Sequence, residues 1–298
     1  MTYSIVARDP ATGALGVAVQ SHYFCVGVAV PWAEASVGAV ATQAMSETSY
    51  GPLGLGLMRG GKSAAEALRA LVAGDAGEAT RQVAMVDARG GVAAHTGARC
   101  IAEAGHRTGD GASVQANMME RATVPDAMLA AYGTTTGDLA DRMLAALDAA
   151  EAEGGDIRGR QSAAMLVVGG KSDGGPWWST RTLELRVEDH PSPLVELRRL
   201  VTLRRAYDAS DRGFEMFRAG DFDGGLAEME NGRRLAPDNT EIAFWMALAL
   251  ARKDVSGSRA MLAECRASEP RWAELLRRLP AAGLFPDNAA LIDELLRD

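Results

Sequence analysis

Cysteine and histidine are scarce in this chain of 298 residues. The three cysteines, Cys25, Cys100 and Cys265, are far apart and odd in number. This pattern excludes a disulfide framework and is typical of a reducing compartment, so we expect a cytoplasmic protein. The four histidines do not stand at the spacing of metal ligands, and no Cys-x-x-Cys pair occurs. The sequence therefore predicts no metal site and no other cofactor.

Long apolar runs and basic clusters are also missing. No segment approaches the roughly 18 uncharged apolar residues of a membrane-spanning helix. The first residues lack the basic and apolar regions of a secretory signal. The chain has 31 basic and 39 acidic residues and a net charge of −8, whereas binding to a phosphate backbone needs clustered lysine and arginine. We therefore expect neither a membrane nor a nucleic acid as a partner.

The composition of the chain changes near residue 190. Short apolar runs rich in glycine, alanine and valine precede this point, and arginine, leucine and glutamate at helical spacing follow it. Pro191 and Pro193 stand at the change, where each removes a backbone donor and interrupts regular structure. We expect a first domain over residues 1–190 and a second, helical one over residues 194–298.

The first domain has the pattern of a layered sheet protein. Alternating or short apolar runs predict strands at 3–8, 15–20, 26–30, 37–43, 82–87, 91–95, 113–117, 163–168 and 182–187. Apolar residues at helical spacing predict helices at about 64–73 and 137–153. Strands arrive in neighbouring pairs and not in strict alternation with helices, which favours an α+β fold over a doubly wound parallel sheet.

The helical region carries a weak internal repeat. Gly220–Gly225 and Leu235–Asn239 are similar to the turn and the exit of a tetratricopeptide repeat, and Pro237 and Pro270 lie 33 residues apart. The period of that family is about 34 residues. The packing positions of the first copy hold Gly213, Met216, Gly225, Met229 and Gly232. An array of helical hairpins of no particular family is the alternative.

One nucleotide-binding pattern in the chain is rejected. Residues 56–63 match G-x-x-x-x-G-K-S letter for letter. A phosphate loop must follow a buried strand, but Gly51, Pro52 and Gly54 interrupt the preceding segment. Ser63 and Glu66 also have the spacing of a helix capping box.

The start of the chain offers a possible nucleophile. Thr2 is small enough for routine removal of Met1, which would leave Thr2 with both a hydroxyl and a free α-amine. The reference pKa of such an amine is about 7.7–8.0, so a useful fraction is neutral at pH 7 and can take the hydroxyl proton. Many chains begin with Met-Thr, and an ordinary first strand is the alternative.

Several segments together resemble a known family. They are YSIVARD (3–9), VQSH (19–22), GAVATQA (38–44), YG (50–51), TGARC (96–100), AGH (104–106), VQANM (114–118) and GDIRGRQSAA (155–164). With them, the chain from Thr2 to about Val187 resembles the Ntn-hydrolase-like family catalogued as the domain of unknown function ten twenty-eight. The resemblance implies a four-layer αββα sandwich, two antiparallel sheets face to face with helices outside. It also implies hydrolysis of amide bonds by the first residue left after processing, and Thr2 is the matching position.

Polar residues in these segments are candidates for the site. Gln115 and Asn117 lie two apart and share one face of a strand, and an amide from Asn117 or Gln43 there can donate to a developing oxyanion. Arginine can clamp a substrate carboxylate. The candidate substrate-binding residues stand at or near strand ends: Ser21, His22, Thr42, Gln115, Arg158, Arg160, Gln161 and Ser162. For each of them the alternative is a polar group that completes the hydrogen bonds of a strand end.

The sequence thus predicts an N-terminal-nucleophile amidohydrolase that acts on a small or peptide-like amide through an acyl-enzyme on Thr2. The alternative is a non-catalytic binding module that uses a pocket of the sandwich and the helical tail for ligands or protein partners. Apolar residues of the tail, including Trp245 and Trp272, make self-association a further expectation.

Overall fold

The computed structural model describes residues 2–176 and 178–297 and divides into two compact units, Met1–Val201 and Thr202–Asp298. The division falls within helix α5 (Pro193–Arg218), the first turns of which belong to unit 1. The change of composition near residue 190 therefore marks the start of α5, and α5 passes into unit 2 only at Thr202. The domain boundary expected at residues 190–194 stays a prediction.

The larger sheet of unit 1 is antiparallel throughout and has the order β10-β9-β2-β1-β8-β7. Its strands are β1 (Thr2–Arg8), β2 (Leu15–Ser21), β7 (Gly105–Gly109), β8 (Ala112–Asn117), β9 (Ser162–Val168) and β10 (Arg181–Val187). The expected hairpin between the first two strands is confirmed, with Gly13 at a φ of 75° in its turn. Since β1 pairs with both β2 and β8, residue 2 begins a strand in the interior of the sheet.

The second sheet has four antiparallel strands in the order β3-β4-β5-β6. They are β3 (Pro31–Glu34), β4 (Gly38–Ala44), β5 (Arg81–Asp87) and β6 (Val92–Thr96). An apolar layer between the sheets combines side chains of both: Val6, Leu15, Val17, Val19, Ala39, Ala41, Ala84, Val86, Ala164 and Leu166. Alternation along each strand sends one set of residues into this layer and the other set toward the helices.

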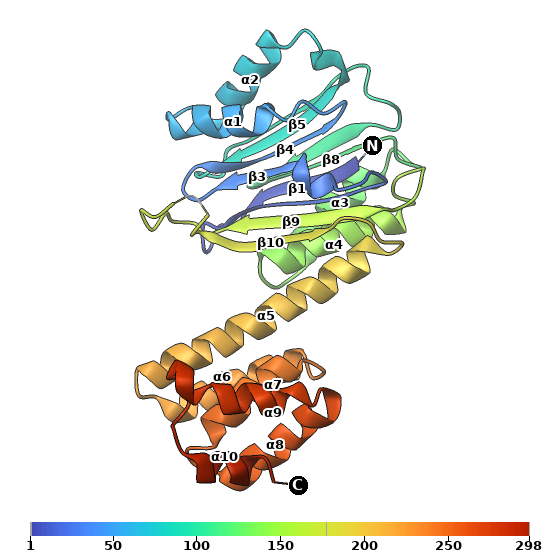
Figure 1. Ribbon diagram of the computed structural model, residues 1–298. Coiled ribbons are helices and arrows are strands. Elements are labelled where there is room, and N and C mark those ends of the chain that lie inside the picture. Colours follow the sequence, from blue (N-terminus) through green and yellow to red (C-terminus); the bar gives the residue numbers. More distant parts are fainter. Residues whose placement is uncertain (1, 177, 298) are drawn as a thin grey trace. The chain divides into compact units, whose positions relative to one another are not determined.

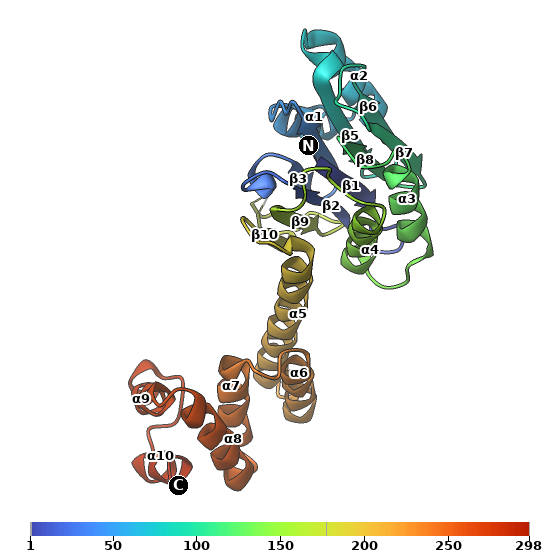
Figure 2. The ribbon, with the colours of Figure 1, turned by 90° about the vertical axis from the view of Figure 1, so that its right-hand side faces the viewer.

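Helices cover the outer faces of both sheets. Helices α1 (Tyr50–Arg59) and α2 (Ala64–Gly74) pack on the four-stranded sheet, and α3 (Val124–Thr134) and α4 (Leu139–Ala152) pack on the six-stranded one (Figure 1, Figure 2). The capping box expected at Ser63 and Glu66 begins α2, and the side chain of Asp138 caps α4. The expected mixture of helices with antiparallel sheets is thereby confirmed.

Three local expectations differ from the structure. The strand expected at 26–30 is a 3₁₀ turn (Val26–Val28). Helices α1 and α3 and the short strands β3 and β7 were not expected. Helix α1 contains four glycine or proline residues, which disfavour a helix. Two of its glycines are needed for close contact, because a Cβ on Gly51 would lie 2.3 Å from the Trp32 ring and one on Gly54 would lie 2.8 Å from Met85. The rejected nucleotide pattern starts within α1 at Gly56 and so does not follow a strand.

Unit 2 consists of the rest of α5 with α6 (Phe222–Leu235), α7 (Thr240–Leu250), α8 (Val255–Ser268), α9 (Arg271–Arg278) and α10 (Ala289–Leu295). Its core is separate from those of unit 1 and centres on Met229, Phe244, Leu262, Leu276 and Leu295. Within the described part of the chain, no helix combines the length and the apolar character needed to cross a membrane.

Two glycines of α1 provide a matched test of this packing. Gly51→Ala places a methyl group against the rigid Trp32 ring, so we expect the free energy of unfolding to fall by about 1–3 kcal/mol. Gly56→Ala meets no atom within 4 Å, so we expect a gain of about 0.5–1 kcal/mol from helix propensity. Urea denaturation measures both, and equal effects of the two changes would contradict this account.

Candidate active site

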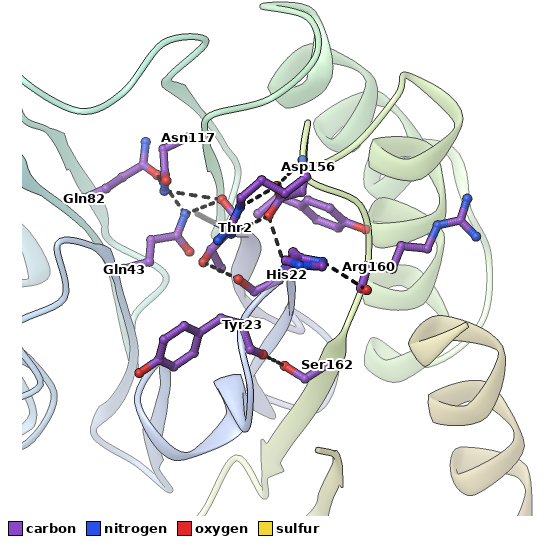
Figure 3. A network of polar contacts seen from close by, with 12 residues as sticks. Thr2, His22, Tyr23, Gln43, Gln82, Asn117, Asp156, Arg160 and Ser162 are labelled. Atoms are coloured by element: carbon purple, nitrogen blue, oxygen red, sulfur yellow. Dashed lines mark hydrogen bonds and ion pairs between the residues drawn. The ribbon is translucent and has the colours of Figure 1, made fainter. Parts of the chain in front are cut away.

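A row of polar residues crosses the six-stranded sheet at the start of β1. Thr2 pairs with Asn117 of β8, and its hydroxyl donates to the Ser21 hydroxyl of β2 at 3.1 Å. Ser21 in turn pairs with Ser162 of β9. Thr2 is 4% exposed, so the row lies at the edge of the buried interior (Figure 3).

Amide side chains of both sheets hold the carbonyl of Thr2. Gln43 of β4 donates through Nε2 to the Thr2 carbonyl at 3.1 Å and to Gln82 Oε1 at 2.7 Å. Asn117 Nδ2 donates to Gln82 Oε1 at 2.8 Å and more weakly to the Thr2 carbonyl at 3.4 Å. We call Gln43, Gln82, Gln115 and Asn117 the amide cluster; Figure 3 labels Gln43, Gln82 and Asn117.

Ser4 connects the remaining member of the amide cluster. Its hydroxyl donates to Gln43 Oε1 at 2.6 Å and accepts from Gln115 Nε2 at 2.6 Å. Each amide of the cluster is at most 1% exposed. Hydrogen bonds in such a dry environment are strong, and an unpaired group is costly, so the cluster holds Thr2 in one position.

The backbone is strained directly after two of these amides. Ala44 and Met118, which follow Gln43 and Asn117, have φ values of 68° and 60°. The left-handed conformation costs a non-glycine residue about 1–2 kcal/mol. Residues held in this way are concentrated at functional sites, where the surrounding structure fixes them.

A buried carboxylate lies on the other side of Thr2 (Figure 3). The side chain of Asp156 is fully buried and accepts from the backbone N–H of His22 at 3.1 Å. It also forms an ion pair with Arg158 Nη2 at 2.9 Å. Because a buried carboxylate is stable only with partners of this kind, Asp156 fixes the position of the chain after β2.

A second ion pair places Arg160. Its Nε lies 2.5 Å from Glu151 Oε2, and the Tyr3 hydroxyl also donates to Glu151. Burial, and then the Glu151 carboxylate, raise the pKa of Tyr3 well above its ordinary value. Both arginines that were expected to bind a substrate carboxylate are therefore paired with carboxylates of the chain itself.

The other candidates lie in different surroundings. The Thr42 hydroxyl donates to the backbone carbonyl of Glu47, at 3.0 Å, and Gln161 Nε2 donates to Asp189 at 3.1 Å. Ser162 donates to the carbonyl of Tyr23 at 2.5 Å. The His22 ring is 3.3 Å from the carbonyl of Arg160. The structure thus brings together Thr2, Ser21, Gln43, Gln115 and Asn117, and it engages Thr42 and Gln161 elsewhere.

Exposed apolar side chains follow the strands that carry the site. Tyr23 comes two residues after Ser21, Met45 two after Gln43, and Ile157 directly after Asp156; they are 59%, 64% and 65% exposed. The backbones of Ile101 and Ile157 both bind that of Met118, at 3.0 and 3.2 Å. We call these exposed residues (Tyr23, Met45, Ile101 and Ile157) the apolar rim.

The residues that match a known family cover most of unit 1. A family model described as "Family of unknown function (DUF1028)" matches residues 2–197. The chain belongs to the DUF1028 family. The chain is similar to the DUF1028 protein SPO2555 from Silicibacter pomeroyi, whose crystal structure is known: the two are 35% identical and superpose with a TM-score of 0.61. The match covers 67% of this chain and 84% of that one. No curated protein matches.

Two members of the candidate site were not expected from the sequence. Gln82 is the second residue of β5 and pairs in register with Gln43, although 39 residues separate them. Asp156 stands in the segment that carried the family resemblance, but its pairing with His22 spans 134 residues. The available signal for Gln82 was a polar residue directly before the apolar run Val83–Val86.

Within residues 2–176 and 178–297, no group of three or more histidine, cysteine or carboxylate side chains is arranged to hold an ion. The cavity of about 520 Å³ in unit 1 is lined by residues of β3, β9 and β10, such as Trp32 and Leu166, and not by Thr2.

A matched pair of buried glutamines tests the amide cluster. Gln43→Met removes donors to the Thr2 carbonyl and to Gln82, so we expect a loss of about 1–3 kcal/mol in the free energy of unfolding. Gln20 is equally buried, but no described group binds its side chain, so we expect Gln20→Met to change stability by less than about 0.5 kcal/mol. Urea denaturation measures the free energy of unfolding of both variants. A larger loss for Gln20→Met than for Gln43→Met would contradict the role assigned to Gln43.

The cluster continues to a histidine that gives a pH-dependent readout. Gln82 donates to the Thr96 hydroxyl at 3.0 Å, which lies 2.8 Å from His106 Nδ1. Burial lowers the pKa of His106 below its ordinary 6.5. Since the unfolded chain then binds this proton first, we expect stability to fall as the pH drops below about 6.5. Urea denaturation at several pH values measures the free energy of unfolding, and His106→Gln should make it depend less on pH. An equal pH dependence in the variant and the parent chain would rule out the role of His106.

Proposed function

We propose that this DUF1028 protein is an N-terminal-nucleophile amidohydrolase that uses Thr2. The observation that carries the proposal is the placement of Thr2: it begins an interior strand, its hydroxyl binds Ser21, and its carbonyl is held by Gln43. Met1 lies outside the described residues, and the proposal requires its removal. The family's own description assigns no function.

The order of layers supports the αββα sandwich expected of that class. The layers follow one another in this order: helices α3 and α4, the six-stranded sheet, the four-stranded sheet, and helices α1 and α2.

The helices of unit 2 support the tetratricopeptide-like pattern. The predicted turn at Gly220 separates α5 from α6, and Pro270 follows α8. A Cβ on Gly213 would lie 2.8 Å from the carbonyl of Gly225, so these helices touch where the tetratricopeptide-like pattern places small residues.

The chemistry follows from a free Thr2. The neutral α-amine takes the proton of Oγ1 as this oxygen bonds to the carbonyl carbon of the amide. The amine passes the proton to the leaving nitrogen as the C–N bond breaks, and an ester remains on Thr2. Water then hydrolyses the ester, which releases the acid and restores the hydroxyl. Ser21 is a positioning residue because it fixes the orientation of Oγ1.

Asn117 is the better of the two oxyanion candidates. Its bond to the Thr2 carbonyl is long, at 3.4 Å, so one donor can turn to a new acceptor at small cost. Gln43 Nε2 has three acceptors within 3.3 Å and a role in holding the two sheets. We therefore assign Asn117 to the oxyanion and Gln43 to positioning.

The substrate we propose is a small or peptide-like amide with an apolar group. The residues of the apolar rim are exposed and lie close to Ser21, Gln43, Asn117 and Asp156, along the chain or through backbone hydrogen bonds, so they offer surface for such a group. A carboxylate on the substrate would meet Arg158 or Arg160 only by sharing them with Asp156 or Glu151.

Substitution of Thr2 tests the mechanism. We expect intact-protein mass spectrometry to find the chain without Met1, and a panel of apolar acyl p-nitroanilides to be hydrolysed. Thr2→Ala should abolish turnover because it removes the nucleophile, and Thr2→Ser should retain it. Thr12→Ala is the matched control, since Thr12 lies in an exposed turn and should leave turnover unchanged.

Two further measurements separate the outcomes. Asn117→Ala should lower kcat by about 10²–10³ if this amide holds the oxyanion. Retention of Met1 in active protein, or full turnover by Thr2→Ala, refutes the mechanism. Absence of turnover by the parent chain favours the non-catalytic alternative.

Self-association, or binding of a protein partner through the helical tail, stays a prediction. Sedimentation of the full chain measures self-association.

A further inference from the structure

Unit 2 contains a cavity of about 1030 Å³ that the proposed chemistry does not use. Its walls are the end of α5, the start of α6, one side of α7 and the segment that leads into α10. Sites for small molecules commonly measure about 300–1,000 Å³, so a ligand of drug size fits. None of its lining residues belongs to unit 1.

Aromatic residues are concentrated in this cavity. Of the six phenylalanines in the chain, four line it, together with a tryptophan: Phe214, Phe217, Phe222, Phe285 and Trp245. Phe214 meets Phe217 and Trp245 edge to face, with ring centroids 6.3 and 6.2 Å apart. All five rings are only half-buried. Only 5% of the residues in the chain are aromatic, so this concentration is unusual. A bound ligand would bury a large apolar area of these rings, which favours binding.

Two arginines give the cavity a positive charge. Arg218 and Arg252 line it, and no carboxylate does. Neither guanidinium has an ion pair or hydrogen bond within the described residues, although the chain carries a net charge of −8. Elsewhere in unit 2, Arg212 and Arg233 bind glutamates at 2.8 and 2.9 Å. The cavity is therefore complementary to an anion.

Few other polar side chains line the cavity. Asn288 is one, and its oxygen already accepts the backbone N–H of Leu291 at 3.1 Å in the cap of α10. A bound peptide would leave most of its backbone groups without partners, which costs free energy. The lining thus favours a body without hydrogen-bonding groups over a peptide.

We propose that this cavity binds an amphipathic anion, a small molecule with an aromatic or alkyl body and a single carboxylate. The body packs on the rings of Phe214, Phe217 and Trp245, and the carboxylate binds Arg218 and Arg252, whose guanidinium groups suit planar oxyanions. This site is independent of Thr2 and of the proposed hydrolysis.

Two dyes with the same body test the proposal on the full chain. Anilinonaphthalene sulfonate carries an acid group, and phenylnaphthylamine lacks it. We expect both to bind with increased fluorescence. The double variant Arg218→Gln/Arg252→Gln should weaken the sulfonate about tenfold and the neutral dye less than about twofold. Arg277→Gln is the matched control, because Arg277 is exposed and does not line the cavity.

Competition then identifies the ligand class. Dodecanoate should displace the sulfonate dye, and dodecyltrimethylammonium at the same concentration should not. Phe285→Ala should weaken both dyes, and circular dichroism confirms that the variants fold. Three results would overturn the proposal. The double arginine variant could bind the sulfonate dye with unchanged affinity, or the cation could displace this dye as well as dodecanoate does. Dye binding could also vanish because two copies of the chain associate through this face.

Discussion

The amide group of Gln43 is the contact on which the candidate site depends. It reaches from the four-stranded sheet to the Thr2 carbonyl at 3.1 Å and accepts the Ser4 hydroxyl of the same strand as Thr2. The apolar layer between the sheets is attractive but not directional. Hydrogen bonds have a required geometry, so those of Gln43 set where the first strand lies against the other sheet.

The amide cluster also explains how a site can be ordered before any ligand binds. Its members satisfy one another, and the strained residues Ala44 and Met118 end the strands where two of its amides lie. The hydroxyl of Thr2 donates a hydrogen bond to the hydroxyl of Ser21. Polar groups that are already oriented need no rearrangement when charge develops, which is the main way in which a protein lowers a reaction barrier.

The two units present different chemistry. In unit 1 the side chains of the amide cluster are buried and paired, and exposed apolar residues follow the strands that carry them. In unit 2 the aromatic rings are half-buried and the arginines Arg218 and Arg252 lack partners within the described residues. The DUF1028 match ends at residue 197, so the cavity of unit 2 lies outside the residues that the family model matches. Each unit therefore requires its own functional account.

Local patterns in the sequence determined the hairpin at Gly13, the capping box at Ser63 and most strands, because alternation and capping depend on residues close in the chain. Only the tertiary structure decided that α1 is a helix, since Gly51 permits close contact with Trp32. It also decided that Gln82 joins Gln43 and that Asp156 meets His22. These contacts join residues far apart in sequence, and their energy comes from burial and mutual hydrogen bonding, which no local pattern contains.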